Sequence, residues 1–310
     1  MKKKLIFDNF DYSNINLSYK GNFKGNINYS KIFKDKFKVQ GFTVTDKYYL
    51  ISAYCILKNR SKSRIYFFDK DNSKYLGFII LDNSSHVGGI SFDNFNKLLY
   101  VTGSKGKVNV YNYENIIELF IKNNYYLDLN SIDKSLYYIK SNINISNILD
   151  GNVSAATIYY YNNYLYVATC SNKGSLVKVK IEYLKNEKAI NSYMTIISKE
   201  LPACIQGLII FDYNDKLFFV ISQSYGMLSS TLKLFDLDNI SFIGQKRFRT
   251  IGIEGIDMNS CGLIKVIFEN GSKKSSLIDI NKLVNKIDVK KENKYIRKGI
   301  IHQKKLDNRS

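Results

Sequence analysis

A small residue at the start of an apolar run recurs five times in this chain of 310 residues, and this repeat constrains the fold more than any other feature. In each copy the small residue opens a run of apolar side chains, which is followed by a turn and a second apolar run. The gaps between copies are 48, 67, 51 and 48 residues. The five small residues are Gly41, Gly89, Ala156, Gly207 and Gly255. Such a period predicts a repeated supersecondary unit whose copies bury a core by packing on one another.

Each copy reads as a series of short strands. In the clearest one, residues 204–238, two apolar runs flank a polar turn, and apolar and polar residues then alternate from Thr231 to Asp236. A weaker fourth strand fits residues 75–81, 194–201 and 242–248. Four strands in roughly 40–50 residues is the spacing of a propeller blade. We therefore predict an all-β fold, a β-propeller of about five four-stranded blades, with the small residues where the inner strands approach the axis.

The chain divides into three parts around this ring. Residues 34–282 hold the propeller, interrupted at 113–150 by an insertion with a short helix over Glu114 to Lys122. We expect the N-terminal segment, residues 1–33, to supply a strand that closes the ring and removes an exposed sheet edge. Residues 283–310 form a basic tail. A single proline and the absence of a Gly/Ser tract favour one domain and no linker.

The chain is strongly basic, with a formal net charge of +19. From Lys282 onward there are ten Lys and Arg residues against three acidic ones, which is typical of a solvated tail. Such a tail could attract nucleic acid or an anionic surface. However, Lys and Asn are enriched along the whole chain, and no nucleic-acid-binding motif accompanies the charge. Nucleic acid is therefore not the partner that we expect, and it remains the second alternative.

Signatures of catalysis, metal binding and export are missing from the sequence. The four cysteines lack metal-ligand spacing, two histidines are too few for a His-rich site, and no phosphate-binding or nucleophile motif occurs. Catalytic residues are therefore unknown, no metal site is assigned, and enzyme status stays open. Asp8 interrupts the N-terminal apolar run, and no run is long enough to span a membrane. We expect a cytoplasmic monomer without a transmembrane segment.

Polar residues gather at one predicted end of the ring. In a propeller blade, the start of the first strand and the end of the second lie on the same face. Ser and Thr residues occupy several of these positions, namely Ser52, Thr102, Thr169 and Ser222. The candidate ligand-binding residues are Gln40, Tyr54, His86, Gln206, Gln223, Tyr225, Glu254 and Glu269. They could equally satisfy one another and fixed waters within a structural channel.

These positions favour a ligand-binding or scaffold module that takes a small polar molecule or glycan at one mouth of the channel. The alternative is a hydrolase or lactonase that uses Glu254 or Glu269, with or without a divalent cation. We assign no cofactor, although a divalent cation is compatible with the carboxylates. Titration with divalent cations separates the two classes.

The blade pattern resembles the β-propeller superfamily over roughly residues 37–280. It is similar to the loosely repeated bacterial propellers of the sugar-lactone, arabinan-processing and NHL-like proteins. The chain has no tryptophan and therefore no Trp-Asp dipeptide, so the WD40 pattern fits poorly. The carboxylate and asparagine pattern of the metal-dependent lactonases is matched only in isolated residues such as Glu254. The resemblance therefore implies an architecture and carries over no catalytic role.

Overall fold

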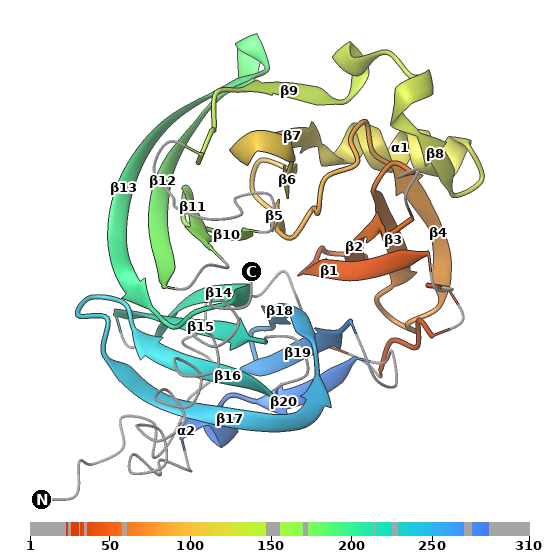
Figure 1. Ribbon diagram of the computed structural model, residues 1–310. Helices are drawn as coiled ribbons and strands as arrows, with labels where there is room; N and C mark the ends of the chain where they lie inside the picture. The colour runs from red at the N-terminus through yellow and green to blue at the C-terminus, as the bar shows by residue number, and fades with distance from the viewer. Residues whose placement is uncertain are drawn as a thin grey trace, which may run out of the picture.

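The chain forms a ring of antiparallel sheets around a central axis, as a computed structural model shows (Figure 1). The structure describes residues 23, 26–30, 32–33, 36–57, 61–146, 156–169, 173–213, 215–224, 229–269 and 275–284. Five consecutive meanders run outward from an inner strand. Each inner strand contacts the inner strands on either side, and the fifth contacts the first. The predicted all-β propeller fold is confirmed.

The first two blades are built as follows. Blade 1 contains β1 (Phe37–Val44), β2 (Tyr48–Cys55), β3 (Arg64–Asp69) and β4 (Tyr75–Ile80). Blade 2 contains β5 (Ile90–Asp93), β6 (Leu98–Thr102), β7 (Val108–Asn112) and β9 (Tyr138–Ser141). Neighbouring strands within each blade are antiparallel.

The remaining blades follow in chain order. Blade 3 contains β10 (Thr157–Tyr161), β11 (Tyr164–Ala168), β12 (Gly174–Leu184) and β13 (Ala189–Leu201). Blade 4 contains β14 (Ile205–Tyr213), β15 (Lys216–Gln223), β16 (Ser229–Asp236) and β17 (Phe242–Ile251). Blade 5 contains β18 (Ile253–Met258), β19 (Leu263–Phe268) and β20 (Ser276–Asp279), followed by the short helix α2 (Asn281–Val284).

The recurrent small residues lie where neighbouring inner strands meet. A Cβ added to Gly89 would lie 2.8 Å from the Ala156 carbonyl oxygen of the next blade. At Gly255 it would lie 2.5 Å from the backbone nitrogen of Phe42, in the first blade. Real Cβ atoms essentially never come this close to backbone, so these positions exclude larger side chains. Close packing of the inner strands around the axis therefore explains why a small residue recurs in each copy of the repeat.

Polar side chains join one blade to the next. The Asp257 carboxylate is 1% exposed and accepts a 2.9 Å hydrogen bond from the backbone N–H of Val44, which links blade 5 to blade 1. The Tyr161 hydroxyl donates to Asp212 at 2.6 Å between blades 3 and 4. Because buried carboxylates need partners, these bonds also satisfy groups that would otherwise be costly to bury.

Residues near the N-terminus pack against blade 5. The Tyr29 side chain is fully buried, and its hydroxyl donates to the Phe268 carbonyl and accepts from the Phe268 N–H, both at 2.8 Å. The backbone of Ile27 exchanges hydrogen bonds with Ser275, which directly precedes β20. Most of the segment 1–33 and of the tail 283–310 lies outside the described residues, so the ring-closing strand and the basic tail stay predictions.

A long segment, residues 113–146, leaves blade 2 and runs along the outer rim; we call it the rim segment. It begins with α1 (Tyr113–Lys122), where the Asn112 side chain caps the N-terminus by accepting from Asn115 N–H. It then pairs β8 (Tyr126–Asp128) with β4 of blade 1 in parallel. It returns as β9, which pairs with β7 and also touches the start of β13. The stretch predicted as an insertion therefore supplies the outer strand of blade 2 and extends the sheet of blade 1.

Candidate functional site

The predicted polar residues lie at one end of the inner strands. Lys38 stands opposite Tyr54 in the β1–β2 pairing, and Ile205 stands opposite Gln223 in the β14–β15 pairing. Ile253 stands opposite Phe268 in blade 5, next to Glu254 and Glu269. We call this end of the ring the polar mouth and define it by Lys38, Gln40, Tyr54, His86, Gln206, Gln223, Glu254 and Glu269.

An ion pair bridges the first and last blades at the polar mouth. The Lys38 ammonium lies 2.5 Å from Oε1 of Glu269, and the two side chains are 42% and 15% exposed. The hydrogen bond to Glu269 raises the pKa of Lys38, and the nearby Glu254 carboxylate adds to the shift. Lys38 therefore stays charged at neutral pH. Lys38 was not among the residues predicted from the sequence, although its place two residues before Gln40 in the same strand could have indicated it.

An aromatic and imidazole pair lies beside this ion pair. The rings of Tyr54 and His86 are 4.1 Å apart between centroids and tilted by 35°. Nδ1 of His86 lies 3.3 Å from Oε1 of Gln40, whose amide nitrogen donates to the Val39 carbonyl at 2.8 Å. Tyr54 and His86 are half-buried and Gln40 is buried. The structure thus brings together five side chains, from blades 1 and 5 and from the connection between β4 and β5: Lys38, Gln40, Tyr54, His86 and Glu269.

The candidate residue Gln223 of blade 4 forms its hydrogen bonds with residues close to it in the chain. The Gln223 amide donates to the Ala203 carbonyl at 2.7 Å, and Thr231 donates to its Oε1 at 3.4 Å. Gln206 is half-buried at the start of β14. Glu254 is 4% exposed, and its strand lies beside the strand that carries Gln206. These residues line the same end of the ring, and Glu254 is more enclosed than Lys38. Tyr225 lies outside the described residues.

The hydroxyl groups predicted at the mouth have a structural role. Ser52, Thr102, Thr169 and Ser222 are all fully buried. Ser52 accepts from the Gly41 N–H at 2.9 Å and donates to the Val87 carbonyl at 2.7 Å, so one hydroxyl joins two blades. Thr102 accepts from the Gly89 N–H at 2.8 Å. These positions carry hydroxyl groups because the backbone N–H and C=O groups of the converging strands need hydrogen-bond partners. The buried hydroxyls therefore offer no surface to a ligand.

Metal-binding clusters are not found in the part of the chain that the structure describes. No three His, Cys, Asp or Glu side chains come together there in an arrangement that could hold an ion. No helix among the described residues is both long and apolar enough to cross a bilayer.

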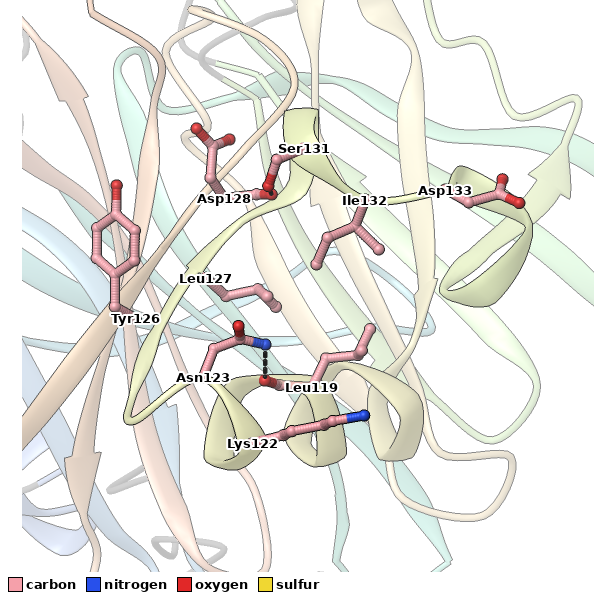
Figure 2. Close-up of a pocket in the computed structure, with 9 residues that line it drawn as sticks. All are labelled: Leu119, Lys122, Asn123, Tyr126, Leu127, Asp128, Ser131, Ile132 and Asp133. Atoms are coloured by element: carbon pink, nitrogen blue, oxygen red, sulfur yellow. Dashed lines mark hydrogen bonds between the residues drawn. The ribbon is translucent and has the colours of Figure 1, made fainter.

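A separate depression of about 480 Å³ lies on the rim between α1 and β8 (Figure 2). Its lining combines apolar side chains such as Leu119 and Leu127 with polar ones. The Asn123 amide donates to the Leu119 carbonyl at the end of α1, and Ser131 Oγ donates to the Asp128 carbonyl, both at 2.8 Å. These polar groups finish local turns, so the polar mouth is the better candidate site.

Comparison with solved structures finds WD40 and other β-propellers. The Dos1 propeller is 10% identical, with a TM-score of 0.35; the match covers 79% of this chain and 56% of the Dos1 chain. The WD40 domain of Doa1 is 10% identical, with a TM-score of 0.39; the match covers 82% of this chain and 95% of the Doa1 domain. The dihydro-haem d1 dehydrogenase NirN is 10% identical, with a TM-score of 0.37; the match covers 80% of this chain and 47% of the NirN chain.

The chain thus spans about half the length of the Dos1 propeller and NirN structures. No protein-family model matches it, and no curated protein does. The similarity concerns the fold alone.

Proposed function

We propose that this protein is a binding module that takes a small polar ligand, most simply a glycan unit, at the polar mouth. The observation that carries the proposal is the gathering of five side chains from blade 1, blade 5 and the connection between β4 and β5, namely Lys38, Gln40, Tyr54, His86 and Glu269. These residues come from positions 38 to 269 of the chain, and only the closed ring brings them together.

The chemistry of the group suits a ligand that has both hydroxyl groups and a non-polar face. The Tyr54 and His86 rings can cover a flat, weakly polar surface while their polar atoms reach outward. The Lys38–Glu269 pair supplies a charged donor and a charged acceptor, which make the stronger hydrogen bonds. Gln40 adds an amide whose orientation is fixed by its bond to Val39. A sugar ring presents this combination of surfaces.

A thermal-shift screen with mono- and disaccharides tests the proposal. We expect at least one sugar to raise the melting temperature of the wild-type protein. Tyr54→Ala should abolish that rise, and Glu269→Gln should weaken affinity at least about tenfold, because a charged hydrogen bond contributes roughly 1.5–3 kcal/mol. The matched control is Asp82→Asn, which removes the 2.8 Å ion pair with Lys134 on the rim and should leave binding unchanged.

Two results would contradict this function. If Glu269→Gln and Tyr54→Ala bind the sugar as the wild type does, the ligand lies elsewhere. If the sugar or a sugar lactone is consumed and Glu254→Gln or Glu269→Gln stops the turnover, the protein is a hydrolase. Repeating the assay with Ca²⁺, Mn²⁺ and Zn²⁺ shows whether a cation takes part.

A further inference from the structure

Among the described residues, the outer edges of blades 1, 2 and 4 are protected, and blade 5 is contacted just before its last strand. β8 covers the edge of β4 in blade 1, and the start of β13 covers the edge of β9 in blade 2. In blade 5, Ile27 binds Ser275 just before β20. The edge strand β17 carries Lys246, Arg247 and Arg249. Charged side chains on an edge strand are a common device against pairing with another chain.

Within the part of the chain that the structure describes, the edge of β13 in blade 3 lacks both kinds of protection beyond Ile190. β9 pairs with it only at Ala189 and Ile190, and no other described strand pairs with its outer side up to Leu201. Residues 189–198 contain no charged residue and no proline, and the charged residues Lys199 and Glu200 follow only near the end of the strand. Tyr193 and Ile196 are 64% and 44% exposed. In Figure 1 this long strand forms the outer boundary of its blade.

An uncharged edge of this length is a template for another strand. Its outward backbone N–H and C=O groups can form a ladder with an extended peptide, while exposed side chains on the strand select its sequence. The described part of β13 offers about ten residues for such pairing, which is longer than an average strand.

The charges around this edge indicate the kind of partner. Residues 173–201 contain six lysines and three glutamates, so the outer half of blade 3 has a net charge of +3. Lys178 and Lys180 stand opposite Thr195 and Tyr193 in the β12–β13 pairing and therefore share a face with them. A second copy of this chain would bring two molecules of formal charge +19 together.

We infer that β13 accepts an extended, acidic segment of a partner protein as a fifth strand of blade 3. The partner supplies main-chain hydrogen bonds along residues 191–200 and carboxylates toward the lysines. This site is separate from the polar mouth and does not depend on a ligand there.

The test uses a fluorescein-labelled peptide of ten alternating valine and glutamate residues. We expect it to bind, to bind more weakly as salt rises, and to slow hydrogen exchange of alternate amides in residues 191–200. A peptide of alternating valine and lysine is the charge-reversed control and should not bind. Hydrogen exchange reports the place of binding, so attachment elsewhere on this basic protein is recognised.

Two proline variants test the edge itself. Successive N–H groups of a strand point to opposite edges, so one of Met194→Pro and Thr195→Pro removes an outward donor while the other breaks the β12–β13 ladder. The variant that keeps its circular dichroism spectrum should bind at least about tenfold more weakly, a loss of about 1.4 kcal/mol. The pair Gln245→Pro and Lys246→Pro on β17 is the matched control, and its folded member should bind normally.

Three results would overturn the inference. The first is that the acidic peptide leaves hydrogen exchange in residues 191–200 unchanged. The second is that the folded β13 proline variant binds as tightly as the wild type. The third is sedimentation of the protein as a dimer that the same proline converts to a monomer, because the occupant of the edge is then a second copy.

Discussion

Lys265 is the most unusually placed charged residue of the described chain. It lies in β19 with no exposed surface, and its ammonium is 4.5 Å from the centre of the Tyr49 ring and 5.8 Å from that of Phe23. The aromatic faces attract the cation, but they do not replace water. Burial therefore lowers the pKa of Lys265 from 10.5 to about 8. The folded protein releases this proton more readily than the unfolded chain does.

This difference predicts how stability depends on pH. Between the folded pKa and the unfolded pKa the unfolded chain binds more protons, so the contribution of Lys265 to stability rises with pH. We expect the stability of the wild type, relative to Lys265→Met, to increase by about 2 kcal/mol from about pH 7 to about pH 10. Urea unfolding of both proteins at several pH values measures it. A stability difference that is constant with pH would contradict the burial of a titrating lysine.

The rim segment stabilises the ring from outside. Phe120 of α1 is fully buried, and its ring centre lies 4.4 Å from that of Phe67 in β3. Gly77 in β4 leaves room for the segment, since a Cβ there would overlap the Tyr125 carbonyl. Leu127 in β8 and Leu129 beyond it are also buried. The segment thus fastens blade 1 to blade 2 by burying apolar surface between them.

Truncation of this contact should loosen the rim segment. We expect Phe120→Ala to cost about 3 kcal/mol or more, because it removes a buried ring and leaves a cavity. Ile121→Ala is the matched control on the same helix, since Ile121 is 47% exposed, and it should cost less than about 0.5 kcal/mol. Urea unfolding gives the two values, and hydrogen exchange should quicken in β4 and β8 of the first variant only. Equal effects would mean that the segment merely rests on the ring.

The ring as a unit depends on the contact between its last and first inner strands. Gly255 of β18 faces the backbone of Phe42 and Gly41 in β1, and Asp257 bonds to Val44 across the same junction. Tyr29 adds two hydrogen bonds to Phe268 from residues that precede β1. A ring that closes through such long-range contacts is expected to unfold as one cooperative unit.

Crowding at this junction should destabilise the whole ring. Gly255→Ala places its new methyl group against backbone that cannot move alone, and such overpacking costs about 1–3 kcal/mol. Gly103→Ala is the control, because its methyl group would meet the side-chain amide of Asn109, which can rotate away. We expect a lower melting temperature for Gly255→Ala and little change for Gly103→Ala. Equal melting temperatures would show that the junction is not tightly packed.

The sequence predicted the strands and their grouping because those signals are local. Alternation of apolar residues marks a strand within a few positions, and the helix Tyr113–Lys122 shows its period within its own ten residues. β8 and β9 escaped prediction for the opposite reason. They are three and four residues long, and each is ordered by a strand about 25 to 50 positions away in the chain.

The residues of the candidate site likewise fall into those that local sequence signals predicted and those that depend on long-range contacts. Gln40, Tyr54 and His86 were selected from their positions within single blades, and the structure brings these three together. Their neighbour Lys38 was missed because its partner, Glu269, follows 231 residues later in the chain. The hydroxyl of Ser52 has the sequence signal of a site residue, yet it is enclosed between two blades.

The amino-acid pattern by itself therefore determined the blade, since strand period, turn residues and axial glycines act over short distances. Ring closure decided the remaining features, which are the Lys38–Glu269 pair, the buried charge of Lys265 and the edge of β13 that no described strand pairs with beyond Ile190. Each depends on which segments meet after the chain has circled the axis. These contacts result from the packing of all the blades in the ring, so they cannot be predicted from a short stretch of sequence.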